Sequence, residues 1–304
     1  MGELRRRGVF LVGFGGPESL EAVPGFVESV LGRTPPEHVT GGAVGRYRAI
    51  GGGSPLPATT RRQALLVGEE LSMRGLDVAV YTGMLHAHPT IGEAAEQILD
   101  DGIEDLIVLS LTPYRCEVST DAYEAAARQA FDGLGPRLRF VPDWNLADGY
   151  VVALADMLGQ ARAAAPADTP VIFSAHSLPE RLMRQGDPYA DQLAATARSV
   201  AIRLGITDWQ LAYQSVSAAA GEPWLGPSVE QVVDRLVAGG AGAVLVDPIG
   251  FIADHVETLY DNDIEHRAHA EAAGLGFYRC RCLNDHPGLI SALADLVITA
   301  VHDG

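Results

Sequence analysis

The feature that most constrains the fold is a regular alternation of short apolar runs with longer stretches of helical periodicity. Short runs of apolar, β-branched and aromatic residues between glycine, proline or polar residues are typical of buried strands. We predict strands at 9–12, 77–81, 106–111, 139–141, 171–174, 209–214 and 243–246. We predict helices at 61–74, 91–101, 119–131, 150–165, 189–204, 228–238 and 287–301. This alternation predicts an α/β fold of parallel sheets with helices on both faces.

The length of the chain favours two lobes over one. A chain of 304 residues is long for a single core and suits two lobes of roughly 150 residues each. A helical stretch of plain composition at 144–165 separates two sets of alternating strands and helices. We therefore expect a first lobe at 1–146 and a second lobe at 147–304.

The charge of the chain excludes one class of partner. The formal net charge is −17, and no basic stripe is present that would replace counterions on phosphates. Nucleic-acid binding is therefore excluded, whereas divalent cations would be attracted.

The N-terminus imitates a secretion signal without meeting its requirements. Three arginines at 5–7 precede an apolar run at 9–12, but that run is too short and breaks at Gly13. No uninterrupted apolar stretch approaches the roughly 18 residues that a membrane span needs. We expect a soluble cytoplasmic protein.

An acidic segment follows the last predicted strand. Glu257, Asp261 and Glu265 are spaced four apart, so a helix would stack the three carboxylates on one face, where like charges destabilise it. Two interpretations remain open: a solvated acidic face, or a path for cations.

His176 lies just past the predicted strand at 171–174 and shortly before Pro179. The carboxyl end of a strand in an open α/β sheet is where ligands bind, which favours a functional role. A buried or capping histidine is the structural alternative.

The glycine-rich loops do not indicate a nucleotide site. The loop at 13–16 has the wrong spacing for a dinucleotide fingerprint, and the loop at 51–53 lacks the lysine of a phosphate loop. We expect the second loop to permit close backbone approach to a flat ligand.

The segments 171–180 and 248–265 belong to a longer ordered series of motifs. The others are Phe14-Gly15-Gly16-Pro17, the run from Ile50 to Leu56, Gln63, Gly83-Met84-Leu85-His86 with Pro89, Thr112-Pro113 through Tyr123, Gly186-Asp187-Pro188-Tyr189, and the segment from Tyr213 to Pro227. With these motifs the sequence resembles the ferrochelatase family over nearly its whole length. The resemblance implies two similar Rossmann-like lobes of the chelatase-like fold, with the metal-insertion residues in the C-terminal lobe.

The activity implied by the resemblance is insertion of ferrous iron into a free-base porphyrin in haem biosynthesis. Two pyrrole protons must leave as the metal enters. A neutral imidazole can accept one and a carboxylate opposite can bind metal or relay protons, which assigns these roles to His176 and Glu257. Pro248, Phe251 and the segment around Trp224 would form rigid walls that bend the ring.

The predicted metal-binding residues are His176, Glu257, Asp261 and Glu265. Asp261 and Glu265 would form a second, hydrated site, which serves either as an iron delivery route or as a regulatory magnesium site.

By resemblance, the porphyrin-binding residues are Phe14, Arg46, Tyr47, Ser54, His86 and Tyr123. Arg46 supplies the fork that suits a propionate. A surface position for Arg46 and plain packing for the two tyrosines are the structural alternatives.

The resemblance is strongest to the coproporphyrin III branch, and protoporphyrin IX is the alternative substrate. Members of that branch often have a tyrosine that ligates the product iron where this chain has Phe14, which offers no ligand. Their early arginine falls near Val30, which leaves Arg33 as a substitute.

The three cysteines, Cys116, Cys280 and Cys282, are too few for a disulfide framework. Some ferrochelatases carry a [2Fe–2S] cluster on one internal and three C-terminal-region cysteines. Four thiolates are needed, so Asp285, His286 or His269 would have to replace one. Reduced thiols are the alternative.

Two rival functions remain open. Another chelatase chemistry would use the same histidine and acids, and a non-catalytic haem-binding or chaperone protein would need no proton acceptor opposite an acid. For the enzyme, we expect the porphyrin as ligand and haem-pathway enzymes as partners.

Overall fold

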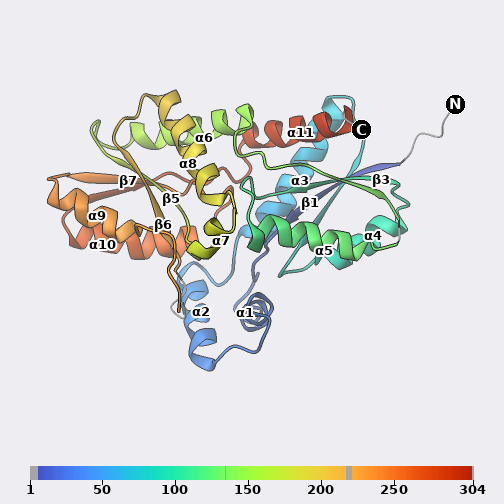
Figure 1. The fold of residues 1–304 in the computed structure, drawn as a ribbon, viewed down its shortest axis with the longest axis horizontal. Coiled ribbons are helices and arrows are strands. Elements are labelled where there is room, and N and C mark those ends of the chain that lie inside the picture. Colours follow the sequence, from blue (N-terminus) through green and yellow to red (C-terminus); the bar gives the residue numbers. More distant parts are fainter. Residues whose placement is uncertain (1–5, 134, 217–220, 303–304) are drawn as a thin grey trace. The chain divides into compact units, whose positions relative to one another are not determined.

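The computed structural model describes residues 6–133, 135–216 and 221–302, which form two compact units (Figure 1). The first unit comprises the described residues of 1–144 and 285–304, and the second comprises those of 145–284. The division lies two residues from the expected boundary at 146, but the C-terminal segment joins the first unit, whereas the sequence suggested the second.

The first unit contains a four-stranded parallel sheet of order β2-β1-β3-β4. Its elements are β1 (Arg7–Gly13), α1 (Val23–Leu31), α2 (Glu37–Ala49), α3 (Leu56–Met73), β2 (Ala79–Met84), α4 (Ile91–Asp100), β3 (Asp105–Ser110), η1 (Glu117–Asp121), α5 (Ala122–Ala130), β4 (Arg137–Phe140) and α11 (Pro287–His302). Phe10 of β1 pairs with Tyr81 on one side and Val108 on the other. Because β1 is central and covered on both faces, its apolar run is continuous and buried.

The second unit repeats this topology with the order β6-β5-β7-β8. Its elements are α6 (Asp148–Ala163), β5 (Val171–His176), α7 (Glu180–Arg184), α8 (Tyr189–Leu204), β6 (Trp209–Gln214), α9 (Val229–Ala238), β7 (Ala243–Asp247), η2 (Glu257–His266), α10 (Arg267–Ala272) and β8 (Gly276–Arg279). The prediction of two similar parallel α/β lobes is therefore confirmed.

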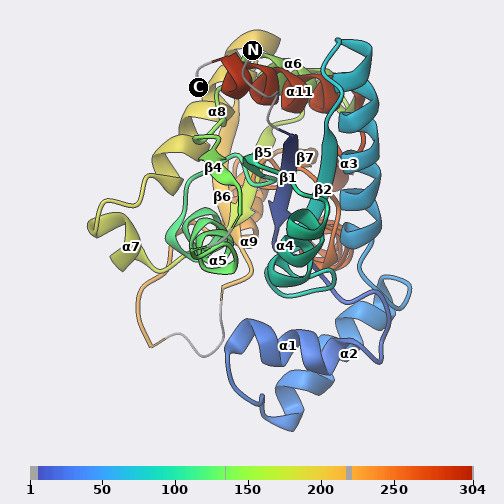
Figure 2. The same cartoon turned by 90° about the vertical axis from the view of Figure 1, so that its right-hand side faces the viewer.

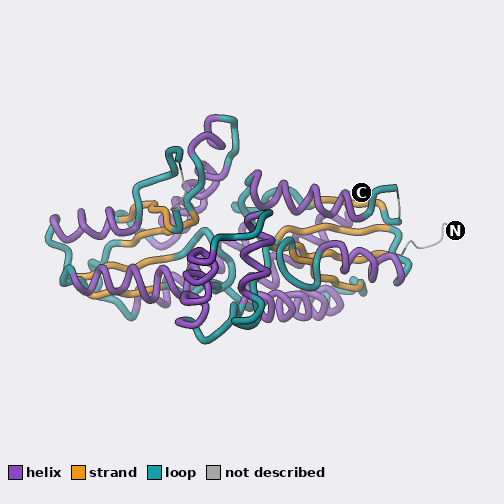
Figure 3. The backbone as a smooth tube through the Cα atoms, turned by 90° about the horizontal axis from the view of Figure 1, so that it is seen from below, coloured by secondary structure: helices purple, strands orange, loops and turns teal. Residues whose placement is uncertain are grey.

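Helices cover both faces of each sheet, as the tube drawing shows for each unit separately (Figure 3). In the first unit, α4 and α5 pack on one face and α3 and α11 on the other, while α1 and α2 lie side by side outside the sheet (Figure 2). In the second unit, α9 and α10 cover one face and α6 and α8 the other. No helix within the described ranges is long and apolar enough to cross a membrane.

Matching helices of the two units begin with the same local signal. Thr90 caps α4 and Ser228 caps α9, each in a reciprocal pair with the side chain three residues on, Glu93 and Gln231. Such a capping box satisfies two orphan donors at a helix start. Both helices then bury their apolar face on the sheet, which forms one core cluster in each unit.

The third strand of each unit is followed by a π-helix: η1 after β3 and η2 after β7. The sequence predicted an ordinary helix at 119–131, and the structure begins that segment with the π-helical turn η1 before α5. Strand β8 and helices α1 and α2 were not predicted. Their segments are short or lack a clear apolar period, so only packing defines them.

Candidate functional site

His176 ends strand β5, which lies between β6 and β7 in the sheet of the second unit. The chain leaves β5 towards β6 and later returns to β7 on the opposite side, so His176 lies at the switch point where α/β sheets bind ligands. Its Nδ1 lies 2.5 Å from the carbonyl oxygen of Ser177. A carbonyl can only accept, so Nδ1 carries the hydrogen and Nε2 is the basic nitrogen.

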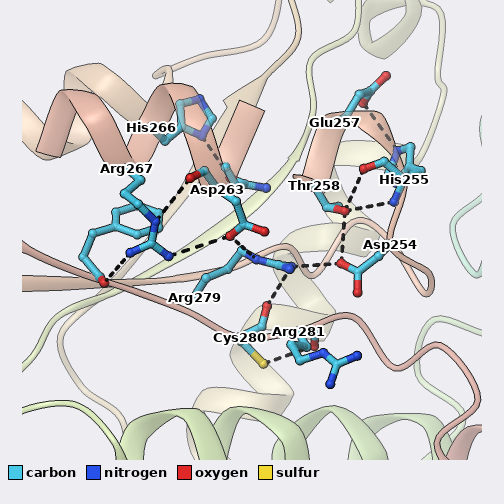
Figure 4. A network of polar contacts seen from close by, with 12 residues as sticks. Asp254, His255, Glu257, Thr258, Asp263, His266, Arg267, Arg279, Cys280 and Arg281 are labelled. Atoms are coloured by element: carbon cyan, nitrogen blue, oxygen red, sulfur yellow. Dashed lines mark hydrogen bonds and ion pairs between the residues drawn. The ribbon is translucent and has the colours of Figure 1, made fainter. Parts of the chain in front are cut away.

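Glu257 faces that basic nitrogen. Its Oε1 lies 3.5 Å from Nε2 of His176. Its Oε2 lies 3.9 Å from Nε2 of His255 (Figure 4). Burial by itself raises the pKa of Glu257, but the charges of His176 and His255 outweigh it and lower the pKa to about 2. Glu257 is therefore ionised at neutral pH, beside two imidazoles.

Glu257 is the first residue of η2, and long-range contacts fix its backbone. The side-chain Nε2 of Gln214, at the end of β6, donates to the carbonyl oxygen of Glu257 at 2.8 Å. Thr258 accepts from the backbone N–H of His255 and donates to Asp254. Sequence reasoning left these partners unassigned, although His255 and Asp254 stand in the same motif as Glu257.

The three acids of η2 differ in environment. Glu257 is half-buried, Asp261 is buried and accepts a 2.5 Å hydrogen bond from Ser215, and Glu265 is exposed. A solvated acidic face describes Glu265 only. Within the described ranges, no three His, Cys, Asp or Glu side chains gather as one metal site, so the predicted ligands His176, Glu257, Asp261 and Glu265 do not form a single coordination sphere.

In the first unit, Phe14 and His86 lie together beyond the carboxyl ends of β1 and β2. Phe14 is 36% exposed, and its ring lies 4.7 Å from that of His86 and 6.2 Å from that of Phe26. Ser29 Oγ lies 2.9 Å from Nδ1 of His86. Burial lowers the pKa of His86, so this imidazole is neutral at physiological pH.

The other predicted porphyrin-binding residues differ in how deeply they are buried. Arg46 is exposed in the last turn of α2, whereas Tyr47 and Ser54 are buried. Tyr123 belongs to the core cluster under α4 and α5 and lines a cavity of about 220 Å³ with Thr112. Tyr123 is 2% exposed.

The glycine loop at 51–53 has an explanation within the chain. Gly51 and Gly52 have φ of 110° and 104°, in the left-handed region that glycine tolerates. A Cβ on Gly53 would lie 2.4 Å from the carbonyl oxygen of Glu18. The left-handed backbone at Gly51 and Gly52 and the close approach of Gly53 to Glu18 therefore each favour glycine.

The three cysteines considered for an iron–sulfur cluster are divided between the two units. All three are buried, and Cys116 belongs to the first unit whereas Cys280 and Cys282 belong to the second. Burial raises the pKa of Cys280 and Cys282 well above the usual range, and nearby carboxylates raise it further, so both are thiols. Of the substitute ligands, His269 is engaged by Asp234 at 2.8 Å.

The fold is the chelatase-like fold, and it carries a histidine–carboxylate pair at the switch point of its second sheet. Two solved structures share this fold: SirB from Bacillus subtilis with Fe³⁺ (TM-score 0.62, 11% identity, 97% of this chain and 95% of that chain) and CbiX, the terminal enzyme of sirohaem biosynthesis in denitrifying bacteria (TM-score 0.59, 13% identity, 97% and 99%).

The particular family follows from sequence comparison. The ferrochelatase family profile matches residues 6–301, and the chain therefore belongs to the ferrochelatase family. It is 38% identical to a ferrochelatase of Deinococcus radiodurans (95% of this chain, 94% of the relative) and 34% identical to a coproporphyrin III ferrochelatase of Anoxybacillus flavithermus (96% and 95%). It is thus a chelatase-type lyase that inserts iron into a porphyrin in haem biosynthesis.

Proposed function

We propose that this enzyme inserts ferrous iron into coproporphyrin III, and that His176 and Glu257 handle the pyrrole protons and the metal. One observation carries the catalytic part of the proposal. The basic nitrogen of His176 faces an ionised carboxylate oxygen at 3.5 Å, while its other nitrogen is occupied by the Ser177 carbonyl.

The proton step follows from that arrangement. As the metal enters, a pyrrole N–H gives its proton to Nε2 of His176, because Nδ1 already carries a hydrogen. The resulting imidazolium is stabilised by the Glu257 carboxylate beside it. Since the pKa of Glu257 is about 2, this carboxylate stays charged throughout the physiological range.

Iron handling uses the acids of η2 one after another. Asp261 and Glu265 supply hard oxygen atoms that suit a hydrated divalent ion, held weakly enough to be released. A regulatory magnesium ion at the same two carboxylates is the alternative. Iron titrations with and without magnesium distinguish iron delivery from magnesium regulation.

The substrate choice rests on relatives and on propionate charge. Several relatives at 32–34% identity are coproporphyrin III ferrochelatases, while those at 36–38% carry the broader name. Coproporphyrin has four propionates where protoporphyrin has two, so it gains more from a dedicated arginine. Arg46 is exposed at the end of α2 and is the residue we assign to a propionate.

The deciding experiment is anaerobic insertion of ferrous iron with coproporphyrin III and protoporphyrin IX side by side. We expect faster turnover with coproporphyrin III. A clear preference for protoporphyrin IX would overturn the substrate assignment and keep the ferrochelatase activity. Haem binding that survives loss of His176, without any metal insertion in the wild type, would instead indicate a non-catalytic haem carrier.

A further inference from the structure

The winding of η2 requires an explanation, because Glu257 is its first residue. A π-helix usually occurs as a single turn inside an α-helix, since its hydrogen-bond pattern is rarely favourable. Here it extends over ten residues, Glu257–His266, before α10 continues the segment. Contacts from outside the helix must therefore stabilise this winding.

The guanidinium of one buried arginine contacts both η2 and the segment just before it. Arg279, the last residue of β8, is 8% exposed. Its Nη1 donates to Oδ1 of Asp254 at 3.0 Å, and its Nε donates to Oδ1 of Asp263 at 2.7 Å (Figure 4). Asp254 precedes η2 and Asp263 lies within it, so Arg279 spans the start of the helix.

The Asp254 end of this bridge is rigid. Its carboxylate also accepts from Thr258 at 3.1 Å and from the side-chain amide of Asn284 at 2.8 Å. Its backbone N–H donates to Oδ1 of Asn284 at 2.8 Å. Because Asp254 is held in this way, the position of the Arg279 guanidinium is fixed. The second contact therefore depends on where η2 places Asp263.

The position of Asp263 depends on how the helix is wound. Successive α-helical residues are rotated by roughly 100°, and a π-helix turns less for each residue. Rewinding η2 as an α-helix would carry the Asp263 carboxylate around the helix axis and away from Arg279. The contact between Asp263 and Arg279 therefore favours the π winding, which also sets the direction of the Glu257 side chain.

We propose that Arg279 is a positioning residue for iron insertion: by bridging Asp254 and Asp263 it holds η2 in its π winding and keeps Glu257 opposite His176. Among the described contacts, Arg279 reaches neither Glu257 nor His176, so it acts through the helix. This inference rests on the proposed roles of His176 and Glu257.

The test uses two variants, one at the Asp263 end of the bridge and one at Arg279 itself. Asp263→Ala removes the carboxylate on η2 and keeps the pair between Arg279 and Asp254. Arg279→Lys keeps the charge but cannot donate two bonds in a fork. Arg267→Met is the matched control, because Arg267 contacts the Asp263 carbonyl oxygen at 3.2 Å and its carboxylate only at 3.9 Å, and makes no described contact with Asp254.

We expect kcat for iron insertion to fall about 100-fold in both variants, the loss typical of a small misplacement of a catalytic group. The porphyrin KM should stay within about twofold, because the Arg279 side chain is buried and is not among the residues assigned to the porphyrin. Hydrogen exchange should accelerate at the amides of η2 and stay unchanged in β5. The double variant should lose no more than the worse single one, since both changes break one bridge.

Three results would overturn the proposal: a kcat unchanged while η2 exchanges faster, an equal loss in Arg267→Met, or additive losses in the double variant. If Arg279→Lys does not fold, Asp263→Ala decides, because the Asp263 side chain is 29% exposed and its loss is tolerable. A wild-type enzyme without insertion would overturn the proposed function itself, whereas normal rates in both variants would overturn only the role of Arg279.

Discussion

At the scale of single residues, the chemistry depends on which nitrogen of His176 is basic. The Ser177 carbonyl occupies Nδ1, which leaves Nε2 directed at Glu257. The site thus pairs a nitrogen that can accept a proton with a carboxylate that remains charged.

The first prediction concerns His176→Ala. This change removes the proton acceptor and little buried volume, so we expect ferrous iron insertion to fall by about 10²–10⁴-fold with the fold retained. Anaerobic initial rates and circular dichroism measure the two effects. His269→Ala is the control, since that histidine pairs with Asp234 on the surface. A variant of His176 that keeps half the wild-type rate would refute the assignment.

The second prediction concerns substrate choice and Arg46. Arg46→Ala should raise the coproporphyrin III KM by about 10- to 100-fold, because a charge-assisted hydrogen bond contributes about 1.5–3 kcal/mol. Turnover of protoporphyrin IX should hardly change. Arg48→Ala, in the same last turn of α2, is the matched control. Equal losses on both porphyrins would assign Arg46 to a shared propionate or a structural role.

At the scale of elements, the π-helix η2 carries acids of different burial on one segment. Asp261 is hydrogen-bonded to Ser215 and buried, and Glu265 is exposed near the other end. The far end is tied down by His266, which lies 3.3 Å from Glu230 of α9. The helix therefore presents carboxylates while both of its ends are held.

The third prediction separates iron delivery from magnesium regulation. Asp261→Asn and Glu265→Gln should raise the iron concentration that gives half-maximal rate and leave the maximal rate less affected, because both acids would act before insertion. Iron titrations with and without added magnesium measure this. If only the response to magnesium changes, the pair is regulatory. Wild-type curves in both variants would make these residues purely structural or solvated.

The fourth prediction concerns acid stability. The hydrogen bond with His266 lowers the folded-state pKa of Glu230 from 4.5 to about 2. A carboxylate whose pKa is lowered on folding contributes its full stabilisation at any pH above its pKa in the unfolded chain. That contribution is lost as the pH falls from about 4.5 towards 2. Glu230→Gln should therefore lower the urea midpoint at pH 6 and lose this difference near pH 2. Glu271→Gln, on the exposed side of α10, should leave the urea midpoint unchanged both at pH 6 and near pH 2. A Glu230→Gln difference independent of pH would contradict the linkage.

At the scale of the whole molecule, the chain builds the same sheet twice and then returns to the first unit. Helix α11 packs on α3 and β3, and its Asp295 accepts from Arg74 of α3 at 2.6 Å. Its buried stripe includes Leu289, Leu293 and Val297. The first unit therefore depends on residues at both ends of the chain.

The fifth prediction tests that organisation with Leu293→Ala. Removing this fully buried side chain should destabilise the first unit by about 2–5 kcal/mol. Hydrogen exchange should then accelerate in β1 and much less in β5, as mass spectrometry of the two strands can measure. Asp295→Ala, an exposed change on the same helix, should have a small effect. Acceleration confined to β5 would place α11 with the second unit.

The sequence by itself determined the properties that depend on near neighbours along the chain. Buried central strands such as β1 and β5 read as continuous apolar runs, and their alternation with helices predicted the parallel sheets correctly. The ordered motifs around His176 and Glu257 predicted the family. The short strand β8 was missed because four residues carry too little periodicity.

Only the tertiary structure decided the properties that depend on residues distant in sequence. Gln214 and Arg279 come from two other strands and contact the Glu257 carbonyl oxygen and the Asp263 carboxylate of η2. The burial of Tyr123 and the return of α11 to the first unit likewise follow from packing. A local pattern specifies which residues can form a helix or strand, but the geometry of a site arises from contacts that the pattern does not encode.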